Sequence, residues 1–426
     1  MDRRVFLVLL LAGCADPSPD ILPAVLPSPT PTPHRPEPVN PPTASGDAAF
    51  DAWAEDFYTR AVQSGLPADL LDRELKGLIP DPRVITLDGR QPEFSKPVSA
   101  YLQGVVTEGR LAQGRTYREA LAYLPGLEQR FAVPREIMLA IWAMETAFGA
   151  TLGDFDVIRS MATLAAQGRR RQFAEDQLVA ALRIIGSGTA PRERLRGSWA
   201  GAMGQTQFIP TTFLTTAVDG DGDGRIDIWG SSADAMASAA NLLAKVGWKM
   251  GASWAREVIL PAGFDYSLTD GPRETPDWWA QLGVVRADGQ GWSAQDQALK
   301  AQLALPAGAT GPAFLLLPNH FAIRRYNNSA AYALGVGMLA DGFMGQPGLV
   351  RPWPVETPLS LTDRIDAQKA LAALGFSPGN PDGIVGTNTR SALKAWQKAR
   401  GLVADGYLSI DMINRLRAET GLTPAT

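Results

Sequence analysis

Residues 137–149 read Ile-Met-Leu-Ala-Ile-Trp-Ala-Met-Glu-Thr-Ala-Phe-Gly, an almost wholly apolar run in which Glu145 is the one charged residue. On a helix, the side chains three and four positions from Glu145 include Ile141, Trp142 and Phe148, so the carboxyl group points into apolar surroundings. Burial raises the pKa of a carboxyl group. The stretch therefore predicts a buried helix that carries a protonated acid.

Two interpretations of Glu145 follow from this segment alone. A carboxylic acid that stays protonated near neutral pH is what general-acid cleavage of a glycosidic bond requires, and desolvation is the usual way to obtain one. The alternative is a structural glutamate paired with an arginine elsewhere in the chain. The other motifs of the chain have to decide between them.

Residues 1–14 have the features of an export signal. A basic start is followed by an apolar run at 5–11 and then by Ala12-Gly13-Cys14, and this apolar run is too short for a membrane span. Residues 11–14 resemble the bacterial lipobox, in which the cysteine is lipidated, and Cys14 is the single cysteine of the chain. A chance thiol in an ordinary signal is the alternative. We predict a lipid anchor at Cys14, after which no free thiol remains for disulfides or catalysis.

Two breaks in composition divide the rest of the chain. Residues 15–46 are rich in proline and poor in apolar residues, which predicts an extended tether. A second Gly- and Pro-rich break at 345–358 separates a body at 47–344 from a tail at 359–420. The net charge of −4 and the absence of a basic tract argue against a nucleic-acid partner. A lipid anchor with a long tether suits a protein that works in the cell wall.

The body reads as mostly helical. Apolar residues recur at helical spacing, with breakers between, at 50–64, 97–113, 135–148, 171–185 and 232–246. We expect a few strands as well, beside the Asp-rich loop described below and at 258–260 and 313–317.

Residues 197–210 concentrate small and hydrogen-bonding side chains in one turn-rich stretch, Gly-Ser-Trp-Ala-Gly-Ala-Met-Gly-Gln-Thr-Gln-Phe-Ile-Pro. Glycine lets the backbone approach a ligand closely, and Ser, Gln and backbone N–H groups can bind sugar hydroxyls or acetamido groups. A packing loop is the alternative.

Three motifs in order resemble the lytic murein transglycosylases of the B type, also called the membrane-bound lytic transglycosylase B family. They are residues 143–149 around Glu145, residues 201–204 with 207–210, and Arg-Tyr-Asn-Asn-Ser at 325–329 with Tyr332. The resemblance extends from about residue 50 to 339 and includes 170–173. It implies a mainly α fold, with a lysozyme-like catalytic core, an additional helical region before it and a small β element.

The resemblance also implies the chemistry. Most glycosidases use two carboxylates, whereas in this family one glutamate protonates the leaving oxygen and then takes the proton of the muramic acid C6 hydroxyl. This cleaves the β-1,4 bond between N-acetylmuramic acid and N-acetylglucosamine without water and closes a 1,6-anhydro ring. The acetamido oxygen of the substrate is thought to help stabilise the intermediate. A buried, solitary Glu145 fits such a double role.

Carried onto matching positions, the resemblance implies that Ser198, Gln207, Tyr326 and Asn327 bind saccharide and orient the acetamido group and Glu145. Family members commonly carry an aromatic residue shortly after an Ala-Asn pair. Here residues 240–243 read Ala-Asn-Leu-Leu, which puts one saccharide contact in doubt.

Three acids flank the helix of Glu145 and are candidates for a second carboxylate: Glu136, Asp154 and Asp156. We favour surface roles for them, because Asp and Glu side chains are usually exposed.

Residues 219–227 follow the spacing of a calcium loop. Asp219, Asp221, Asp223 and Asp227 occupy positions one, three, five and nine, and Gly224 occupies position six. Arg225 stands at position seven, which coordinates through its backbone carbonyl in such loops. Position twelve is Gly230, so Asp234 is the candidate that closes the site. The family carries a comparable loop with a displaced final acid, which supports a structural Ca²⁺. An acidic turn without metal is the alternative, and the chemistry itself needs no cofactor.

The tail contains two Asp-Gly turns, at 382–383 and 405–406, each beside a helical pattern. It resembles a peptidoglycan-binding domain of the three-helix kind. Its groove residues stay open, since Asp382, Thr387, Arg390 and Trp396 suit capping, turn and core roles equally well.

The sequence thus favours a lytic transglycosylase that is anchored at Cys14, with the outer membrane as the expected membrane, and that acts on peptidoglycan glycan strands in the periplasm. A muramidase that uses water, as goose-type lysozymes do, is one alternative. A non-catalytic wall-binding scaffold lipoprotein is the other.

Overall fold

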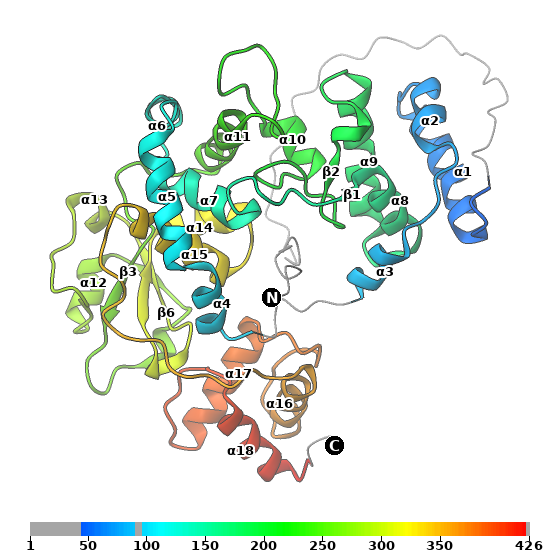
Figure 1. The fold of residues 1–426 in the computed structure, drawn as a ribbon. Coiled ribbons are helices and arrows are strands. Elements are labelled where there is room, and N and C mark those ends of the chain that lie inside the picture. The colour runs from blue at the N-terminus through cyan, green and yellow to red at the C-terminus, as the bar shows by residue number, and fades with distance from the viewer. Residues whose placement is uncertain (1–43, 90–95, 423–426) are drawn as a thin grey trace, which may run out of the picture.

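The structure is a computed structural model and describes residues 44–89 and 96–422 (Figure 1). The predicted signal, Cys14 and nearly all of the predicted tether lie outside these residues. None of the helices in the described ranges combines the length and apolar character that a membrane crossing needs.

Helix α7 (Arg135–Thr146) lies at the centre of the body, and every residue from Glu136 to Thr146 is buried. A helix that is apolar on nearly all sides is stable only when other elements surround it. Helices α5, α6, α11 and α15 pack against α7. Helix α7, which contains most of the apolar run at 137–149, is therefore the element around which the body is assembled.

The elements around α7 come from both sides of it in the chain. Those before it are α1 (Ala48–Gln63), α2 (Ala68–Leu75), α3 (Pro82–Asp88), α4 (Val98–Val105), α5 (Glu108–Ala120) and α6 (Leu124–Phe131). Those after it are β1 (Phe155–Asp156), α8 (Val157–Gln167), α9 (Arg171–Gly186), β2 (Arg196–Gly197), α10 (Pro210–Thr216), α11 (Ser232–Lys245), α14 (Pro318–Tyr326) and α15 (Ala330–Phe343).

Between α11 and α14 the chain forms a small antiparallel sheet with strand order β4-β6-β7-β3-β5. The strands are β3 (Ala255–Ile259), β4 (Arg273–Glu274), β5 (Val285–Arg286), β6 (Ala301–Ala304) and β7 (Ala313–Leu316), with α12 (Pro276–Gln281) and α13 (Ala294–Gln297) between them. The strands expected at 258–260 and 313–317 are thus confirmed as β3 and β7. No strand lies in the Asp-rich loop or directly beside it in the chain, since described residues 217–231 contain no strand and the helices α10 and α11 flank them.

The predicted helices at 50–64, 135–148, 171–185 and 232–246 correspond to α1, α7, α9 and α11 within two residues at each end. The single helix predicted at 97–113 is wrong, because it is two helices, α4 and α5. The backbone leaves the helical conformation at Val106, and Thr107 then accepts a hydrogen bond from the N–H of Arg110 as the N-cap of α5. A capping threonine inside an apolar pattern was the signal for this break.

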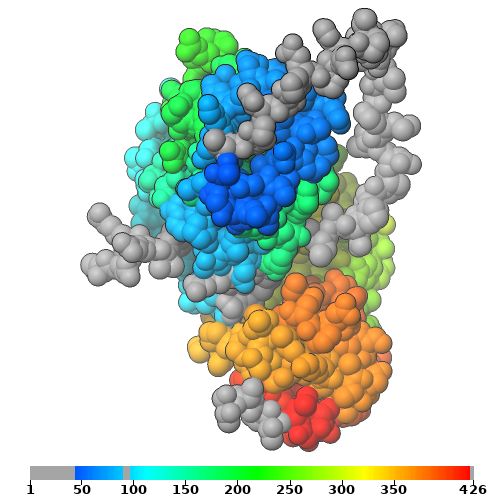
Figure 2. Space-filling model, turned by 90° about the vertical axis from the view of Figure 1, so that its right-hand side faces the viewer, coloured from blue at the N-terminus to red at the C-terminus, as the bar shows by residue number. Residues whose placement is uncertain are grey.

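The tail forms a compact domain of α16 (Leu361–Ala373), α17 (Thr387–Ala399) and α18 (Ile410–Thr420), seen as the orange and red lobe in Figure 2. Trp396 is fully buried in its core. Each Asp-Gly turn is held by a buried glutamine: the amide oxygen of Gln368 accepts from Gly383 N at 2.7 Å, and that of Gln397 accepts from Gly406 N at 2.8 Å. The internal repetition seen in the sequence is therefore a repeated hydrogen-bonding device.

Residues 345–358, which we call the interdomain segment, lie against the sheet. The carboxylate of Glu257 on β3 accepts from the backbone N–H groups of Val350 at 2.7 Å and Arg351 at 2.8 Å. Trp353 stacks on Phe314 of β7, with ring centroids 6.2 Å apart. These contacts fix a segment that its Gly and Pro content alone would leave mobile.

The C-terminal domain also contacts the body directly. Asp405 accepts a hydrogen bond from the backbone N–H of Ala309 at 2.8 Å, and the ammonium group of Lys394 donates to the carbonyl of Thr269 at 2.5 Å. Together with the interdomain segment, these contacts give the C-terminal domain one defined position below the sheet (Figures 1 and 2).

Close packing of α5 on α15 generates a stability prediction. A methyl group added at Gly114 would lie 2.1 Å from the ring of Phe343, so Gly114→Ala should cost about 1–3 kcal/mol through overpacking and lower the melting temperature. Gly109→Ala in the same helix meets no atom within 4 Å and is the matched control; it should leave the melting temperature unchanged or slightly raised. Equal melting curves for the two variants would contradict the packing argument.

Candidate functional site

Glu145 is 5% exposed and lies in the last turn of α7. One carboxyl oxygen, Oε1, accepts the hydroxyl of Tyr332 at 2.5 Å. The other, Oε2, is buried and has no hydrogen-bond partner. Burial raises the pKa of Glu145 from 4.5 to about 8, although the hydrogen bond from Tyr332 opposes the rise. Glu145 is therefore a neutral acid at pH 7 with one oxygen free for a ligand.

The chain turns sharply after this acid. Ala147, Phe148 and Gly149 have φ values of 50°, 60° and 80°, and positive φ is uncommon for residues other than glycine. Three such residues in succession end the helix at Thr146. The turn is held by Thr146, whose hydroxyl accepts from Gly149 N at 3.0 Å and donates to the carbonyl of Gln205 at 2.6 Å.

Gln205 joins the end of α7 to residues 197–210, which we call the Gly-rich loop. Its amide oxygen accepts the indole N–H of Trp142 at 2.9 Å, and its amide nitrogen donates to the carbonyl of Trp229 at 3.1 Å. Its backbone N–H donates to Ile228 at 2.8 Å. A single buried side chain thus connects α7, the Gly-rich loop and the end of the Asp-rich loop. The sequence argument did not single it out.

Ser198 and Gln207 shape the Gly-rich loop. Ser198 Oγ accepts from the N–H of Ala202 at 3.0 Å, which closes a tight turn. Gln207 has a φ of 51°, and its amide nitrogen donates to the carbonyls of Gly204 at 2.9 Å and of Leu152 at 3.1 Å. The amide oxygen of Gln207 is buried without a partner, so it is available to a ligand.

Tyr326 and Asn327 lie at the C-terminal end of α14. The hydroxyl of Tyr326 donates to the carbonyl of Thr206 at 2.5 Å, which ties α14 to the Gly-rich loop. Burial raises the pKa of Tyr326 well above its usual value, and the carboxyl group of Glu145 contributes to the rise when it is ionised. The side-chain amide nitrogen of Asn327 is buried without a partner.

Tyr332 is the functional residue that sequence reasoning did not name as a site residue. It stands in the first turn of α15, which Ser329 caps by accepting from Tyr332 N at 3.2 Å. It is 1% exposed, and burial raises its pKa well above its usual value, so its hydroxyl stays a donor to Glu145. Tyr332 belongs to the third motif of the sequence analysis, together with residues 325–329, and this membership was the signal that could have identified it as a site residue.

The three flanking acids have other partners. Glu136 is 5% exposed and forms a salt bridge with Arg118, so the surface role favoured for it is wrong. Asp156 caps α8 by accepting from Arg159 N at 3.0 Å and pairs with Arg192 at 2.9 Å. The side chain of Asp154 is 79% exposed and lies 3.9 Å from Arg83.

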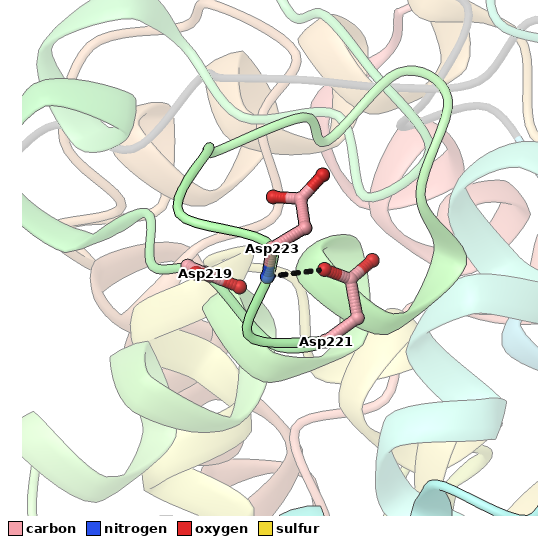
Figure 3. Close-up of side chains that lie close together, drawn as sticks. All are labelled: Asp219, Asp221 and Asp223. Atoms are coloured by element: carbon pink, nitrogen blue, oxygen red, sulfur yellow. Dashed lines mark hydrogen bonds between the residues drawn. The ribbon is translucent and has the colours of Figure 1, made fainter.

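The Asp-rich loop brings three carboxylates together. One oxygen from each of Asp219, Asp221 and Asp223 lies within 4.8 Å of the others. Figure 3 shows the three side chains close together on the loop. Asp219 also accepts the N–H groups of Gly222 at 2.6 Å and Gly224 at 2.8 Å, so the loop curls around this carboxylate. Oxygen ligands at this spacing fit a calcium ion.

Asp234 lies beneath this loop and holds its backbone. Its two oxygens accept the N–H groups of Gly220 at 2.7 Å and of Asp227 at 2.6 Å, and it is 1% exposed. Asp227 in turn pairs with Arg194. Arg225 is exposed, and its N–H donates to Asp223 Oδ1 at 2.7 Å. The predicted coordination by Asp234 and by the carbonyl of Arg225 stays a prediction.

Comparison with known families decides the identity of this arrangement. Residues 49–341 match the Transglycosylase SLT domain family. The chain belongs to this family. Residues 360–416 match the peptidoglycan-binding domain family. The B-type lytic murein transglycosylase resemblance, the mainly α fold and the three-helix C-terminal domain are thereby confirmed.

Relatives of this transglycosylase include a curated sequence and solved structures. The chain is 32% identical over 221 residues to membrane-bound lytic murein transglycosylase B of Escherichia coli K12, a match that covers 50% of this chain and spans 58% of that relative's length. SltB3 of Pseudomonas aeruginosa, solved with NAG-anhNAM-pentapeptide and with NAG-NAM-pentapeptide, is 47% identical, with a TM-score of 0.83 over 87% of this chain and all of the other. The E. coli lytic transglycosylase Slt35, solved with bulgecin A and with calcium, is 28% identical, with a TM-score of 0.58 over 68% of this chain and 92% of the other.

The buried state of Glu145 generates a pH-dependent stability prediction. Glu145 binds its proton up to about pH 8 in the folded protein but only up to its ordinary value of 4.5 in the unfolded chain. Below pH 4.5 both states are protonated and the group has no effect. Between pH 4.5 and 8 the folded state binds more protons, so this carboxyl lowers stability increasingly as the pH rises.

Glu145→Gln removes this titration. The difference in melting temperature between the variant and wild type should therefore be near zero at pH 4.5 and grow in the variant's favour towards pH 8, since each pKa unit is worth about 1.4 kcal/mol. Glu136→Gln, on the same helix, breaks a buried ion pair and should lower the melting temperature instead. A melting-temperature difference for Glu145→Gln that does not change with pH would show that the carboxyl is not desolvated.

Proposed function

We propose that the protein is a peptidoglycan lytic transglycosylase that cleaves the β-1,4 bond between N-acetylmuramic acid and N-acetylglucosamine and forms 1,6-anhydromuramic acid ends. The observation that carries this proposal is the state of Glu145: a buried acid with a pKa of about 8 and one oxygen without a partner. The complex of SltB3 with an anhydro-muropeptide supports the same chemistry for a relative.

Three buried polar atoms without partners support a role for the predicted site residues. Glu145 Oε2, the amide oxygen of Gln207 and the amide nitrogen of Asn327 are all buried without partners, whereas such groups are nearly always satisfied in folded proteins. Together they offer one acid, one acceptor and one donor. A sugar that carries hydroxyl and acetamido groups can satisfy all three.

In the first step, Glu145 donates its proton to the glycosidic oxygen. The bond between C1 of the muramic acid and that oxygen breaks, and N-acetylglucosamine leaves with the proton as its C4 hydroxyl. Glu145 is then a carboxylate, and the hydrogen bond from Tyr332 to Oε1 at 2.5 Å stabilises its charge. The acetamido oxygen of the substrate can stabilise the positive charge that develops at C1.

In the second step, the C6 hydroxyl of the same muramic acid attacks C1 and passes its proton to Glu145. The 1,6-anhydro ring closes, and the acid is regenerated without water. Ser198, Gln207, Tyr326 and Asn327 bind the saccharide and orient its acetamido group in this scheme. Tyr326 has a second task, since its hydroxyl holds the Gly-rich loop through Thr206.

A hydrolytic muramidase and a non-catalytic scaffold are the competing functions. Hydrolysis by two carboxylates calls for a base that activates water, but Glu136 and Asp156 are engaged in ion pairs and Asp154 is largely exposed. Against a scaffold stands the cost of Glu145, because keeping a buried carboxyl neutral at pH 7 lowers stability without a structural return.

We infer that the Asp-rich loop binds a structural Ca²⁺ through Asp219, Asp221 and Asp223, with the carbonyl of Arg225 and with Asp234 closing the site. The calcium complex of Slt35 supports this for a relative. The ion would neutralise three adjacent carboxylates and hold the loop whose last residues, Ile228 and Trp229, contact Gln205. Calcium thereby supports the end of α7 without taking part in the chemistry.

We also infer that Cys14 carries a lipid anchor and that the protein works in the periplasm, with the outer membrane favoured. The name of the E. coli relative, a membrane-bound enzyme, supports an attachment to the membrane. The C-terminal domain would hold the enzyme on peptidoglycan strands while the tether at 15–46 spans the distance to the anchor.

The products of murein digestion test the proposed reaction. The full-length protein should release muropeptides with 1,6-anhydro ends, measured by mass spectrometry. Glu145→Gln should reduce their release by at least a thousandfold, because it removes the proton donor and acceptor of both steps. Asp154→Asn is the matched control at an exposed acid and should retain wild-type release. Products with reducing muramic acid ends would establish a hydrolase instead, and unchanged release by Glu145→Gln would exclude Glu145 as the catalyst.

A calcium titration tests the metal site without reference to activity. Calcium at a hundred times its dissociation constant should stabilise the folded protein by about 2.7 kcal/mol and raise its melting temperature. Asp221→Asn and Asp223→Asn should abolish this rise, while Glu55→Gln, at an exposed acid on α1, should keep it. A melting temperature that does not respond to millimolar calcium would exclude the site.

A further inference from the structure

Positively charged side chains from the body and from the C-terminal domain converge on the end of the sheet. Arg273 lies on β4, Arg324 on α14, and Arg390 and Lys394 on α17. Asp270 lies 3.4 Å from Arg390 and 3.8 Å from Lys394, and the charge of Asp405 also acts on Lys394. Among the described residues, these four cations therefore have two carboxylates near them.

The body contributes two guanidinium groups from neighbouring positions. The guanidinium of Arg273 lies 3.8 Å from the ring centroid of Phe321 on α14, and Arg324 stands one helical turn further along the same face. Arg324 donates to the side-chain oxygen of Asn328 at 2.8 Å, but its Nε is buried without a partner. In the described ranges neither arginine forms an ion pair.

The C-terminal domain contributes the third guanidinium group. Nε of Arg390 is buried without a hydrogen bond, and its partner is the carboxylate of Asp270 at 3.4 Å. Burial lowers the pKa of Arg324, and the charges of Arg390 and Arg273 lower it further, so Arg324 is close enough to each of the other two guanidinium groups to be repelled by both.

The described surroundings offset only part of this repulsion. Burial lowers the pKa of the neighbouring His320 to about 3, with Arg324 and Arg273 adding to the effect, so His320 is neutral. Asp270 acts on Arg390, Lys394 and Arg324, and Asp405 acts on Lys394, so the three arginines and Lys394 face two carboxylates. Like charges held this close are costly unless an anion joins them.

We propose that Arg273, Arg324 and Arg390 form a carboxylate-binding site, shared by the body and the C-terminal domain, that takes the free carboxylates of the peptide stems of peptidoglycan. Guanidinium groups bind carboxylates through paired N–H donors. This inference rests on the proposed function, since it takes peptidoglycan as the ligand.

The position of the site on the fold argues for the stem peptide rather than another anion. Arg324 lies on α14, the helix whose C-terminal end carries Tyr326, a proposed saccharide contact, and Arg390 lies in the domain that matches peptidoglycan-binding domains. The ligand common to both is the glycan strand. In peptidoglycan the lactyl carboxyl of muramic acid is joined to the peptide as an amide, so the free carboxylates belong to the peptides.

Two substrates with the same glycan test the proposal. Cleavage by the full-length protein is measured on peptide-bearing strands and on strands from which an amidase has removed the peptides. The preference is the kcat/KM for peptide-bearing strands divided by the kcat/KM for peptide-free strands. It should fall about tenfold in Arg273→Gln and in Arg324→Gln, through a rise in the KM for peptide-bearing strands. Arg183→Gln, at an exposed arginine on α9, should keep the wild-type preference. Arg273 is exposed, so its variant keeps the test valid if Arg324→Gln does not fold.

Direct binding separates this proposal from the proposed function. Calorimetry with full-length Glu145→Gln should detect binding of a free stem tetrapeptide. This binding should be lost when the carboxylates of the peptide are amidated. It should weaken about tenfold when Arg273→Gln is added. Loss of preference and binding in Arg183→Gln as well, or an unaltered ratio in both arginine variants, would overturn the proposal. Equal binding of inorganic phosphate, or binding to vesicles of anionic phospholipid that depends on Arg273, would also overturn it. An absence of anhydro products from both wild-type reactions would instead remove the proposed function.

Discussion

The arrangement of the helices in the body keeps one carboxyl group, that of Glu145, away from water. Glu145 stays neutral because α7 is surrounded by other helices, and its burial raises the pKa to about 8. Packing of the whole helix offsets the free-energy cost of burying this carboxyl group, since the ten other residues from Glu136 to Thr146 are also buried. The hydrogen bond from Tyr332 limits the rise in pKa, and the proposed double role requires such a limit because the acid has to lose its proton and regain it.

The sequence predicted the elements whose signals are local. The apolar spacing of α7, the Asp-Gly turns of the tail and the Asp spacing of the acidic loop each depend on residues close in the chain, and all of them appear in the structure. The fold class and the family were equally accessible, because the motifs carry them in order. The single helix predicted at 97–113 failed where a capping threonine outweighed the apolar pattern.

The rest of the site depends on contacts between distant residues. Tyr332 reaches Glu145 across 187 positions of the chain, and Gln205 meets Trp142 across 63. No local pattern marks either pair. The burial of Glu136 likewise depends on Arg118 from another helix, so an acid that composition assigns to the surface lies inside. Such pairs could be inferred only once the helices had been placed around α7.

The interdomain segment gives the enzyme a fixed geometry. Because Glu257 and Phe314 hold it against the sheet, the C-terminal domain does not sample positions around the body as it would on a flexible linker. A flexible linker would raise the local concentration of every nearby strand. A rigid connection raises the local concentration only of those strands that run in the direction, and over the distance, set by the body and the C-terminal domain. Under the proposed function, the architecture of the wall, rather than affinity for a single sugar, would then determine which strands the protein engages.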